Sequence, residues 1–119
     1  MKNIKQVDHV TDVVLAKGII DNQVTINYAL YALKNKTADG YYFASLVKWL
    51  AKGCGYSTAQ ARSGQVPAAT GGLAKHGWTE ITSGGTTYVC DADLALEIGP
   101  TIDRWYMFPY SQSPIVYTF

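Results

Sequence analysis

Apolar residues recur at helical spacing in one segment of the N-terminal third. Ile26, Ala29, Leu30 and Leu33 occupy positions i, i+3, i+4 and i+7, which places their side chains on one face of an α-helix. The spacing therefore predicts a helix over residues 25–36.

The same spacing returns in the next segment of the chain. Phe43, Leu46, Val47 and Leu50 form a second apolar stripe, and the stripe predicts a core-facing helix over residues 41–52. Two such helices in succession indicate a helical first half of the domain.

Capping residues mark the limits of this second helix. Asp39 precedes it, and its carboxylate can accept hydrogen bonds from the free amides of a first helical turn. Gly53 and Gly55 follow it, and glycine favours helix ends.

Shorter helices are predicted over residues 7–17, 58–62, 67–76 and 91–98. In the third of these, Pro67 fits the first helical position and Gly77 the C-terminal cap. Gly71 and Gly72 weaken it, because glycine costs about 1 kcal/mol against alanine inside a helix. The fourth begins after Asp91, which can serve as its N-cap.

A β-hairpin is predicted over residues 78–90. Both arms are rich in threonine, isoleucine, tyrosine and valine, and Gly84-Gly85 between them suits a two-residue turn. The register gives one apolar and one polar face. Its cross-strand pairs are Ile81 with Tyr88 and Thr82 with Thr87.

The last fifteen residues, 105–119, are dense in aromatic side chains and contain Pro109 and Pro114. Proline opposes a regular helix, so an extended segment is expected that packs back over the domain or docks on a partner. Packing back is favoured, because each buried aromatic residue adds much to a small core.

Composition adds limits to this picture. The 119 residues are 48% hydrophobic and 16% charged, which fits one globular domain with a packed core. No apolar run is long enough to span a bilayer or to act as a signal peptide, and a cytoplasmic protein is expected. Cys54 and Cys90 lack zinc-site spacing, so we expect reduced thiols and neither metal nor cofactor.

Charge is distributed unevenly along the chain. Residues 41–90 contain four basic residues against one acidic residue, whereas residues 91–119 contain one basic residue against four acidic residues. A weakly positive middle can attract phosphate, although solvated surface lysines explain the same pattern equally well.

In the order of its predicted elements, the chain resembles the winged helix-turn-helix superfamily. The resemblance covers roughly residues 24–90, and its most specific part is the run from Leu73 to Ile81 that leads into the Gly84-Gly85 turn. The expected fold is α+β, a small, mostly helical domain with one hairpin. An N-terminal helical extension at residues 1–23 and a C-terminal helix with an aromatic tail at residues 91–119 complete it.

The resemblance implies a non-catalytic module that binds double-stranded DNA, such as a regulator of transcription or replication. Arg62 can grip a phosphate or a guanine edge, Gln65 can pair with adenine, and Lys75 can contact phosphate. The full set of implied DNA-binding residues is Arg62, Ser63, Gln65, Thr70, Lys75, His76, Thr86 and Thr87.

Two alternatives stay open. The winged-helix frame also serves as a protein-docking or oligomerisation module, and Trp105, Tyr106, Phe108 and Tyr110 would then contact the partner. A less favoured alternative is an enzyme loosely similar to cell-wall cysteine peptidases, with Cys54 as nucleophile and His9 or His76 as base. Cys54, however, follows its predicted helix instead of opening it.

Overall fold

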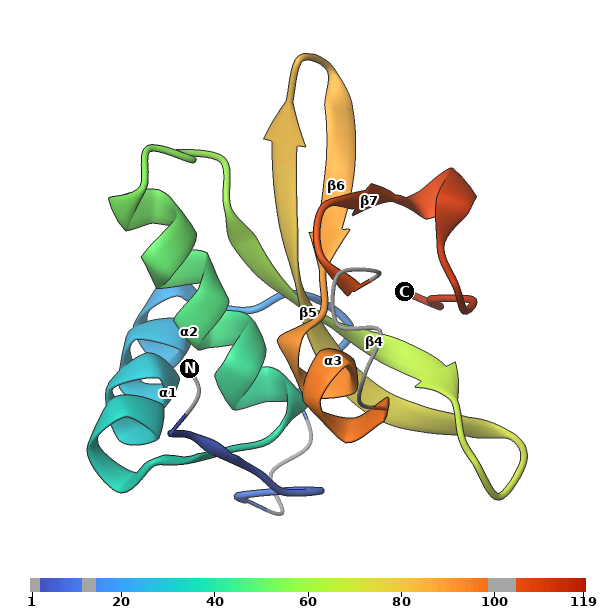
Figure 1. Ribbon diagram of the computed structural model, residues 1–119, viewed down its shortest axis with the longest axis horizontal. Helices are drawn as coiled ribbons and strands as arrows, with labels where there is room; N and C mark the ends of the chain where they lie inside the picture. The colour runs from blue at the N-terminus through green and yellow to red at the C-terminus, as the bar shows by residue number, and fades with distance from the viewer. Residues whose placement is uncertain (1–2, 12–14, 99–104) are drawn as a thin grey trace.

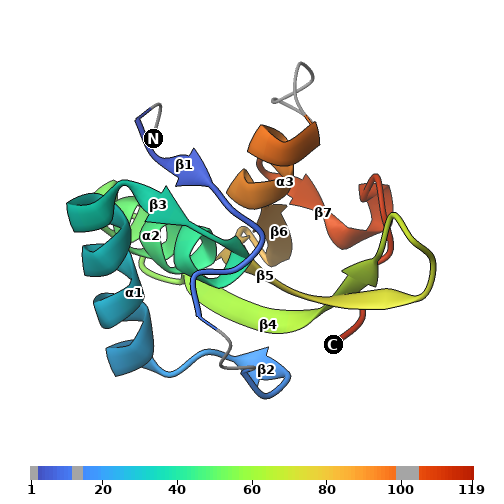
Figure 2. The ribbon, with the colours of Figure 1, turned by 90° about the horizontal axis from the view of Figure 1, so that it is seen from below.

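The computed structural model describes residues 3–11, 15–98 and 105–119. Its main sheet is antiparallel and has the strand order β2 (Gly18–Ile19), β4 (Gln60–Pro67), β5 (Leu73–Ser83), β6 (Thr86–Cys90) and β7 (Phe108–Pro109). A short parallel pair, β1 (Lys5–Gln6) and β3 (Thr37–Ala38), lies beside the helices (Figure 2).

The described residues form three α-helices beside the sheet: α1 (Asn22–Asn35), α2 (Gly40–Gly53) and α3 (Ala92–Ile98). Helix α2 packs on β4 and β5, and α1 packs against α2 (Figure 1). Helix α3 follows β6 and contacts both α2 and β1. Among the described residues, no helix has the length and apolar character needed to span a membrane.

The two long helices confirm the positions predicted from apolar spacing, but Leu30, Leu33 and Leu50 of the predicted apolar stripes are exposed. Asp39 caps α2, because its carboxylate accepts from the backbone N–H of Tyr42 at 3.1 Å. Asp21 caps α1 in the same way, through the N–H groups of Gln23 and Val24. Phe43 and Leu46 of α2 are almost completely buried in the core between the helices and the sheet.

The predicted hairpin is also confirmed, in the register expected. Gly84 and Gly85 form its turn with φ values of 59° and 80°, a left-handed conformation that glycine adopts without strain. The observed cross-strand pairs include Ile81 with Tyr88 and Thr82 with Thr87.

The mostly helical fold class is wrong, because the described residues contain about as much strand as helix. The segments predicted as helices 58–62 and 67–76 instead contribute to β4, to β5 and to the turn between them, and these strands pair from Gln60–Glu80 to Pro67–Leu73. Gly71 and Gly72 have φ values of 95° and 69° and form the turn between these strands. The glycine pair that weakened the predicted helix therefore forms a hairpin turn.

The predicted N-terminal helix over residues 7–17 is also absent from the part of it that is described. Strand β1 ends at Gln6, the following residues to position 11 are turn and coil, and β2 begins at Gly18. Backbone pairing explains the difference, because β1 pairs with β3 and β2 with β4. Val14, which contributed to the helical spacing, lies outside the described residues.

The aromatic tail runs from one side of the main sheet to the other. Strand β7 pairs with β6, and a 3-10 helix, η2 (Tyr110–Gln112), follows it. Near the end of the chain the backbone of Thr118 pairs with Gln65 of β4. Between these points the tail buries Phe108 and Tyr117 beside the fully buried Trp78 of β5.

Candidate functional site

The residues expected to contact DNA do not lie on one helix. Arg62 of β4 is paired within the chain: its Nε lies 2.9 Å from Glu80 Oε2, and its guanidinium lies 4.5 Å from the ring centroid of Phe119. Ser63 is completely buried, and the backbone of Gln65 bonds to Thr118. These three residues therefore support the sheet and the tail.

The other members of this set lie at separate places. Thr70 lies in the exposed β4–β5 turn, while Thr86 and Thr87 lie near the tip of the β5–β6 hairpin. Lys75 and His76 lie side by side in β5 and line the same cavity. These two are the members that the structure brings together at a hollow surface.

The residues named for a protein partner lie along the start of the tail. Trp105 and Phe108 are buried with Trp78, whereas Tyr106 and Tyr110 are half-buried. The Tyr110 hydroxyl accepts from Trp78 Nε1 at 2.8 Å and donates to the carboxylate of Glu80. The contacts of this segment are thus made largely with its own sheet.

A buried histidine–aspartate pair lies at the cavity, which His76 lines and Asp91 does not. His76 is 7% exposed and Asp91 is 1% exposed, and Nε2 of the imidazole lies 2.8 Å from Asp91 Oδ2. Asp91 Oδ2 also accepts from the Tyr117 hydroxyl at 2.6 Å, and its Oδ1 accepts from the N–H of Leu94. Because three donors hold this carboxylate, the orientation of the imidazole is fixed.

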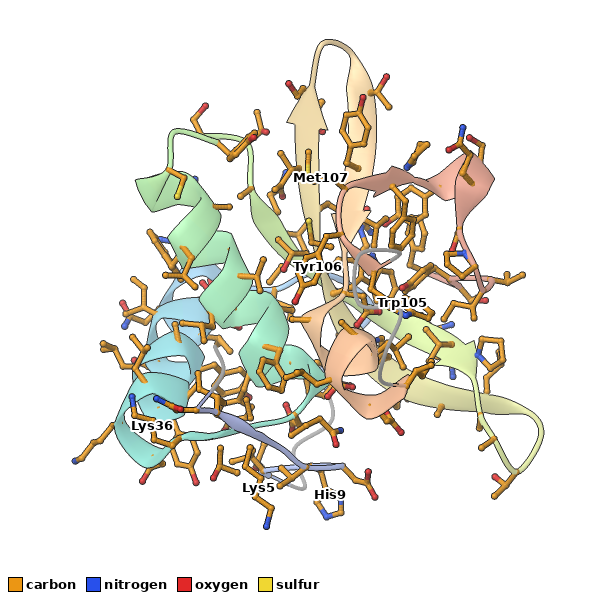
Figure 3. All side chains as sticks on the ribbon, in the orientation of Figure 1. Lys5, His9, Lys36, Trp105, Tyr106 and Met107 are labelled. Carbon is orange, nitrogen blue, oxygen red and sulfur yellow. The ribbon has the colours of Figure 1, made fainter. Side chains whose placement is uncertain are left out.

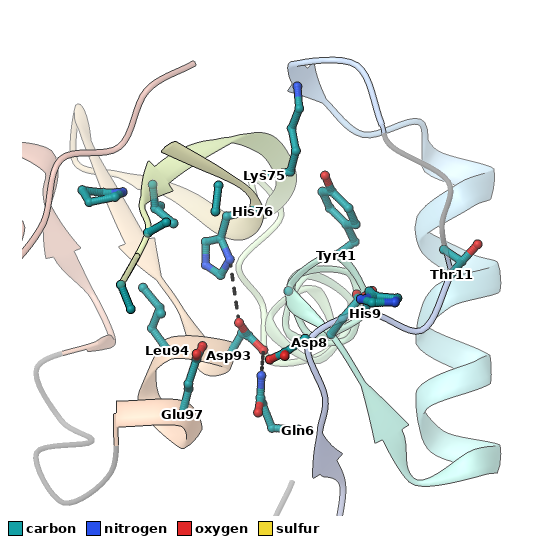
Figure 4. Close-up of a pocket in the computed structure, with 17 residues that line it drawn as sticks. Gln6, Asp8, His9, Thr11, Tyr41, Lys75, His76, Asp93, Leu94 and Glu97 are labelled. Atoms are coloured by element: carbon teal, nitrogen blue, oxygen red, sulfur yellow. Dashed lines mark hydrogen bonds and ion pairs between the residues drawn. The ribbon is translucent and has the colours of Figure 1, made fainter. Parts of the chain in front are cut away.

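A second carboxylate faces the other nitrogen of the same ring. Asp93 Oδ2 lies 3.7 Å from His76 Nδ1, and Asp93 Oδ1 accepts from Gln6 Nε2 at 3.0 Å. Figure 4 shows Gln6, Asp93 and His76 in this order along the wall of the cavity. The N-terminal segment, helix α3 and strand β5 therefore meet at one charged cluster.

This environment shifts the pKa values of both titratable partners. Burial alone would lower the pKa of His76, but Asp91, Asp93 and Glu97 outweigh it and raise that pKa above the ordinary 6.5. Burial raises the pKa of the Asp93 carboxyl to about 6, although His76 and Gln6 act to lower it. His76 is thus favoured as an imidazolium, and the pKa of Asp93 lies well above that of an ordinary aspartate.

The N-terminus of α2 forms the neighbouring wall of the site. Gly40 is the first residue of this helix. A Cβ atom built on Gly40 would lie 2.9 Å from His76 Nδ1 and 3.1 Å from His76 Cε1. The absence of a side chain at position 40 therefore allows the imidazole to lie directly against the first turn of the helix.

The cavity itself has a volume of about 480 Å³ and opens between β1, α2, α3 and the β4–β5 hairpin. Acidic residues at its wall outnumber the basic ones among the described residues. The acidic set is Asp8, Asp39, Asp93 and Glu97, and the basic set is His9, Lys75 and His76. The cavity therefore suits a ligand that carries hydrogen-bond donors or positive charge.

The cysteine considered as a nucleophile lies far from this histidine. Cys54 is the C-cap of α2 and is exposed, whereas His76 abuts the first residue of the same 14-residue helix. At 1.5 Å per residue the two ends are about 20 Å apart. Cys54 and Cys90 are both free thiols, and within the described ranges no group of histidine, cysteine and acidic residues is arranged to hold a metal.

Several residues of the site were missed by sequence reasoning or given another role. Asp91 was predicted as a helix cap, which it is, but its partnership with His76 was not anticipated. Asp93 and Gln6 were not singled out. A signal was available in the predicted hairpin over residues 78–90. His76 lies two residues before its first arm, and the acids at positions 91 and 93 follow its second arm directly, so the hairpin brings them close together.

Comparison with known proteins identifies no relative: no family model, curated protein or solved structure matches this chain. The geometry of the cavity and the chemistry of its residues are accordingly the basis for the function proposed below.

Proposed function

We propose that the chain is a binding protein that holds a peptide-like ligand, without covalent chemistry, in the cavity over His76. One observation carries the proposal: a buried imidazole, fixed by Asp91, turns its Nδ1 edge toward Gly40 and Asp93 at the cavity wall. A strongly perturbed titratable pair inside a pocket is a common mark of a functional site.

The chemistry of the wall defines the class of ligand. An imidazolium at His76 can donate to a carbonyl oxygen, while Asp8 and Glu97 can accept from amide N–H groups or an amine. A peptide offers both kinds of group at close spacing. A free anion such as phosphate fits poorly, because the acidic side chains at the wall outnumber the basic ones.

The proposal is tested by NMR titration of the ¹⁵N-labelled protein with a positional library of blocked tripeptides. We expect amide shifts at Ala74, Lys75, His76 and Asp93 and unchanged spectra with inorganic phosphate. Peptides that leave these four amides unmoved at millimolar concentration, or phosphate that moves them as strongly, would overturn the proposal.

Matched variants locate the binding surface. The double variant Asp8→Asn with Glu97→Gln preserves side-chain shape and removes two negative charges from the exposed part of the wall. It should therefore lower the affinity for cationic peptides about tenfold. Thr87→Ala, at the β5–β6 hairpin, should leave binding unchanged. Equal effects of the two variants would place the ligand elsewhere.

Random-sequence duplex DNA, the ligand expected from the sequence, provides a second comparison in the same titration. DNA contact through Lys75 or the β5–β6 hairpin would shift those amides and weaken steeply with added salt. Such a result would favour a separate nucleic-acid surface over the cavity.

A further inference from the structure

The direction in which position 40 points is the starting observation. The Cα–Cβ vector of a residue placed there is aimed at the imidazole, since the ideal Cβ lies 2.9 Å from His76 Nδ1. The other ring nitrogen bonds to Asp91 at 2.8 Å. Position 40 and Asp91 thus lie at the two different nitrogens of the His76 ring, in a line from position 40 through His76 to Asp91. Position 40, occupied by glycine, has no side chain.

This line matches the general arrangement of a nucleophile, a base and a group that orients the base. The base accepts the proton of the nucleophile through one nitrogen, and the orienting carboxylate holds the other. In this chain Asp91 is fully buried and held by Tyr117 and Leu94. The positioning part of such a triad is therefore complete.

The location at the start of α2 favours the same assignment. A helix N-terminus stabilises negative charge, and a thiol beside an imidazolium at such a place has a lowered pKa. Among the described residues that line the cavity there is no cysteine or serine. Thr11 and Lys75 also line the cavity, but they come from the N-terminal segment and from β5, not from the first turn of α2.

We propose that position 40 is the nucleophile position of a triad with His76 and Asp91, left empty by Gly40, so that the cavity binds acyl compounds (amides or esters) without forming a covalent intermediate. The choice of acyl compounds rests on the proposed binding function and narrows it. A carbonyl group held against the first turn of α2 would lie beside His76 Nδ1, where an acyl carbon meets an attacking atom.

The test is Gly40→Cys in a Cys54→Ser background, which removes the exposed native thiol. Alkylation by iodoacetamide forms a sulfur–carbon bond and releases iodide, and its rate follows the thiolate fraction. At pH 6 we expect a rate at least about tenfold above that of Cys54 in the unmodified protein. Adding His76→Gln should abolish the difference. An ordinary thiol titration near pH 8.5 would overturn the proposal.

An acyl substrate provides a second measurement on the same variant. The thiolate should attack the carbonyl carbon of p-nitrophenyl acetate, forming a thioester while the carbon–oxygen bond breaks and p-nitrophenolate leaves. We expect a burst that is stoichiometric with protein and absent from Gly40→Ala in the same Cys54→Ser background. A burst of equal size in both variants would also overturn the assignment.

Folding of these variants is itself informative, because a Cβ at position 40 would lie 2.9 Å from His76 Nδ1 and 3.2 Å from the backbone nitrogen of Gly77, so the neighbouring atoms must shift to accept it. Gly40→Ala has the same Cβ and no nucleophile. If both variants fail to fold, position 40 accepts no side chain and the proposal is overturned. A reactive thiol combined with no peptide binding in the unmodified protein would instead overturn the proposed function and leave the triad assignment standing.

Discussion

Two hairpins share strand β5, and they differ in what surrounds them. The β5–β6 hairpin turns at Gly84 and Gly85, where an added Cβ would meet nothing within 4 Å. The β4–β5 hairpin is enclosed at its base: a Cβ on Gly77 would lie 2.8 Å from Tyr41 Cδ1, and one on Gly64 would lie 2.4 Å from the Thr118 carbonyl oxygen. The turn of the β4–β5 hairpin is equally open, because an added Cβ on Gly71 or Gly72 would also meet nothing within 4 Å. The hairpins differ in their paired strands, where Gly64 and Gly77 of the β4–β5 hairpin are packed against the tail and α2.

This difference explains how the site is assembled. Small residues in β4 and β5 let α2 approach the sheet closely, and Gly77 lies against the backbone of Tyr41. The approach brings the first residue of α2 to the imidazole of His76, which precedes Gly77. Close packing of the β4–β5 hairpin is therefore what positions the candidate site, whereas the tip of the β5–β6 hairpin is spatially separate from it (Figure 3).

Truncation of Trp78, in the strand that both hairpins share, should have the largest effect on stability. Trp78 is completely buried in β5, bonds through Nε1 to Tyr110 and packs against Tyr117. Trp78→Ala should lower the free energy of unfolding by about 3–5 kcal/mol, as measured by urea denaturation followed by circular dichroism. Val116→Ala, at a 70% exposed tail residue, is the control and should change it little. Equal losses would contradict the described core.

Glycine-to-alanine substitutions should have smaller effects on stability, and these effects should differ between the two hairpins. Gly77→Ala places a methyl group against the backbone and ring of Tyr41 and should cost about 2–3 kcal/mol. Gly85→Ala meets open space and bears only the cost of a left-handed φ of 80°, about 1 kcal/mol. Thermal unfolding of both variants checks the order. A larger loss at Gly85 would show that the β5–β6 hairpin, not the β4–β5 hairpin, limits stability.

The same contrast explains how far the sequence could be interpreted. Helices α1 and α2 and the β5–β6 hairpin were predicted because their signals are local: apolar spacing, a capping aspartate and a glycine turn. In β4, buried positions are held by Ser63 and Gly64, so the strand carries no clear apolar alternation. These residues are small because other segments approach them, and that information is not local.

The site shows the same limit in another form. His76 was named from the sequence, but as a residue at the end of a helix, because the preceding glycine pair was assigned to that helix. Its contacts with Asp91 and Gly40 join β5 to the start of α3 and the start of α2. Such contacts follow from strand pairing, which apolar spacing alone did not provide.

The last prediction concerns pH and Asp93 of helix α3, which lines the cavity beside the β4–β5 hairpin. Burial raises the pKa of Asp93 to about 6 from the ordinary 3.8. The groups that face its carboxyl are His76, Asp91, Glu97 and the Gln6 amide. A raised carboxyl pKa stabilises the fold below pH 4, and this contribution is lost as pH rises through 6.

The variant Asp93→Asn should not show this loss of stability with rising pH. Between pH 4 and pH 6.5, the unfolding free energy of the unmodified protein should fall relative to that of Asp93→Asn by about 1–2 kcal/mol, as solvent at the cavity mouth screens part of the shift. Urea denaturation at each pH gives the comparison. Thr87→Ala, on the other hairpin, should follow the unmodified protein at every pH. Parallel curves for Asp93→Asn and the unmodified protein would show that this carboxyl titrates normally. The stability of the β4–β5 side of the molecule would then depend on pH no more than that of the β5–β6 hairpin.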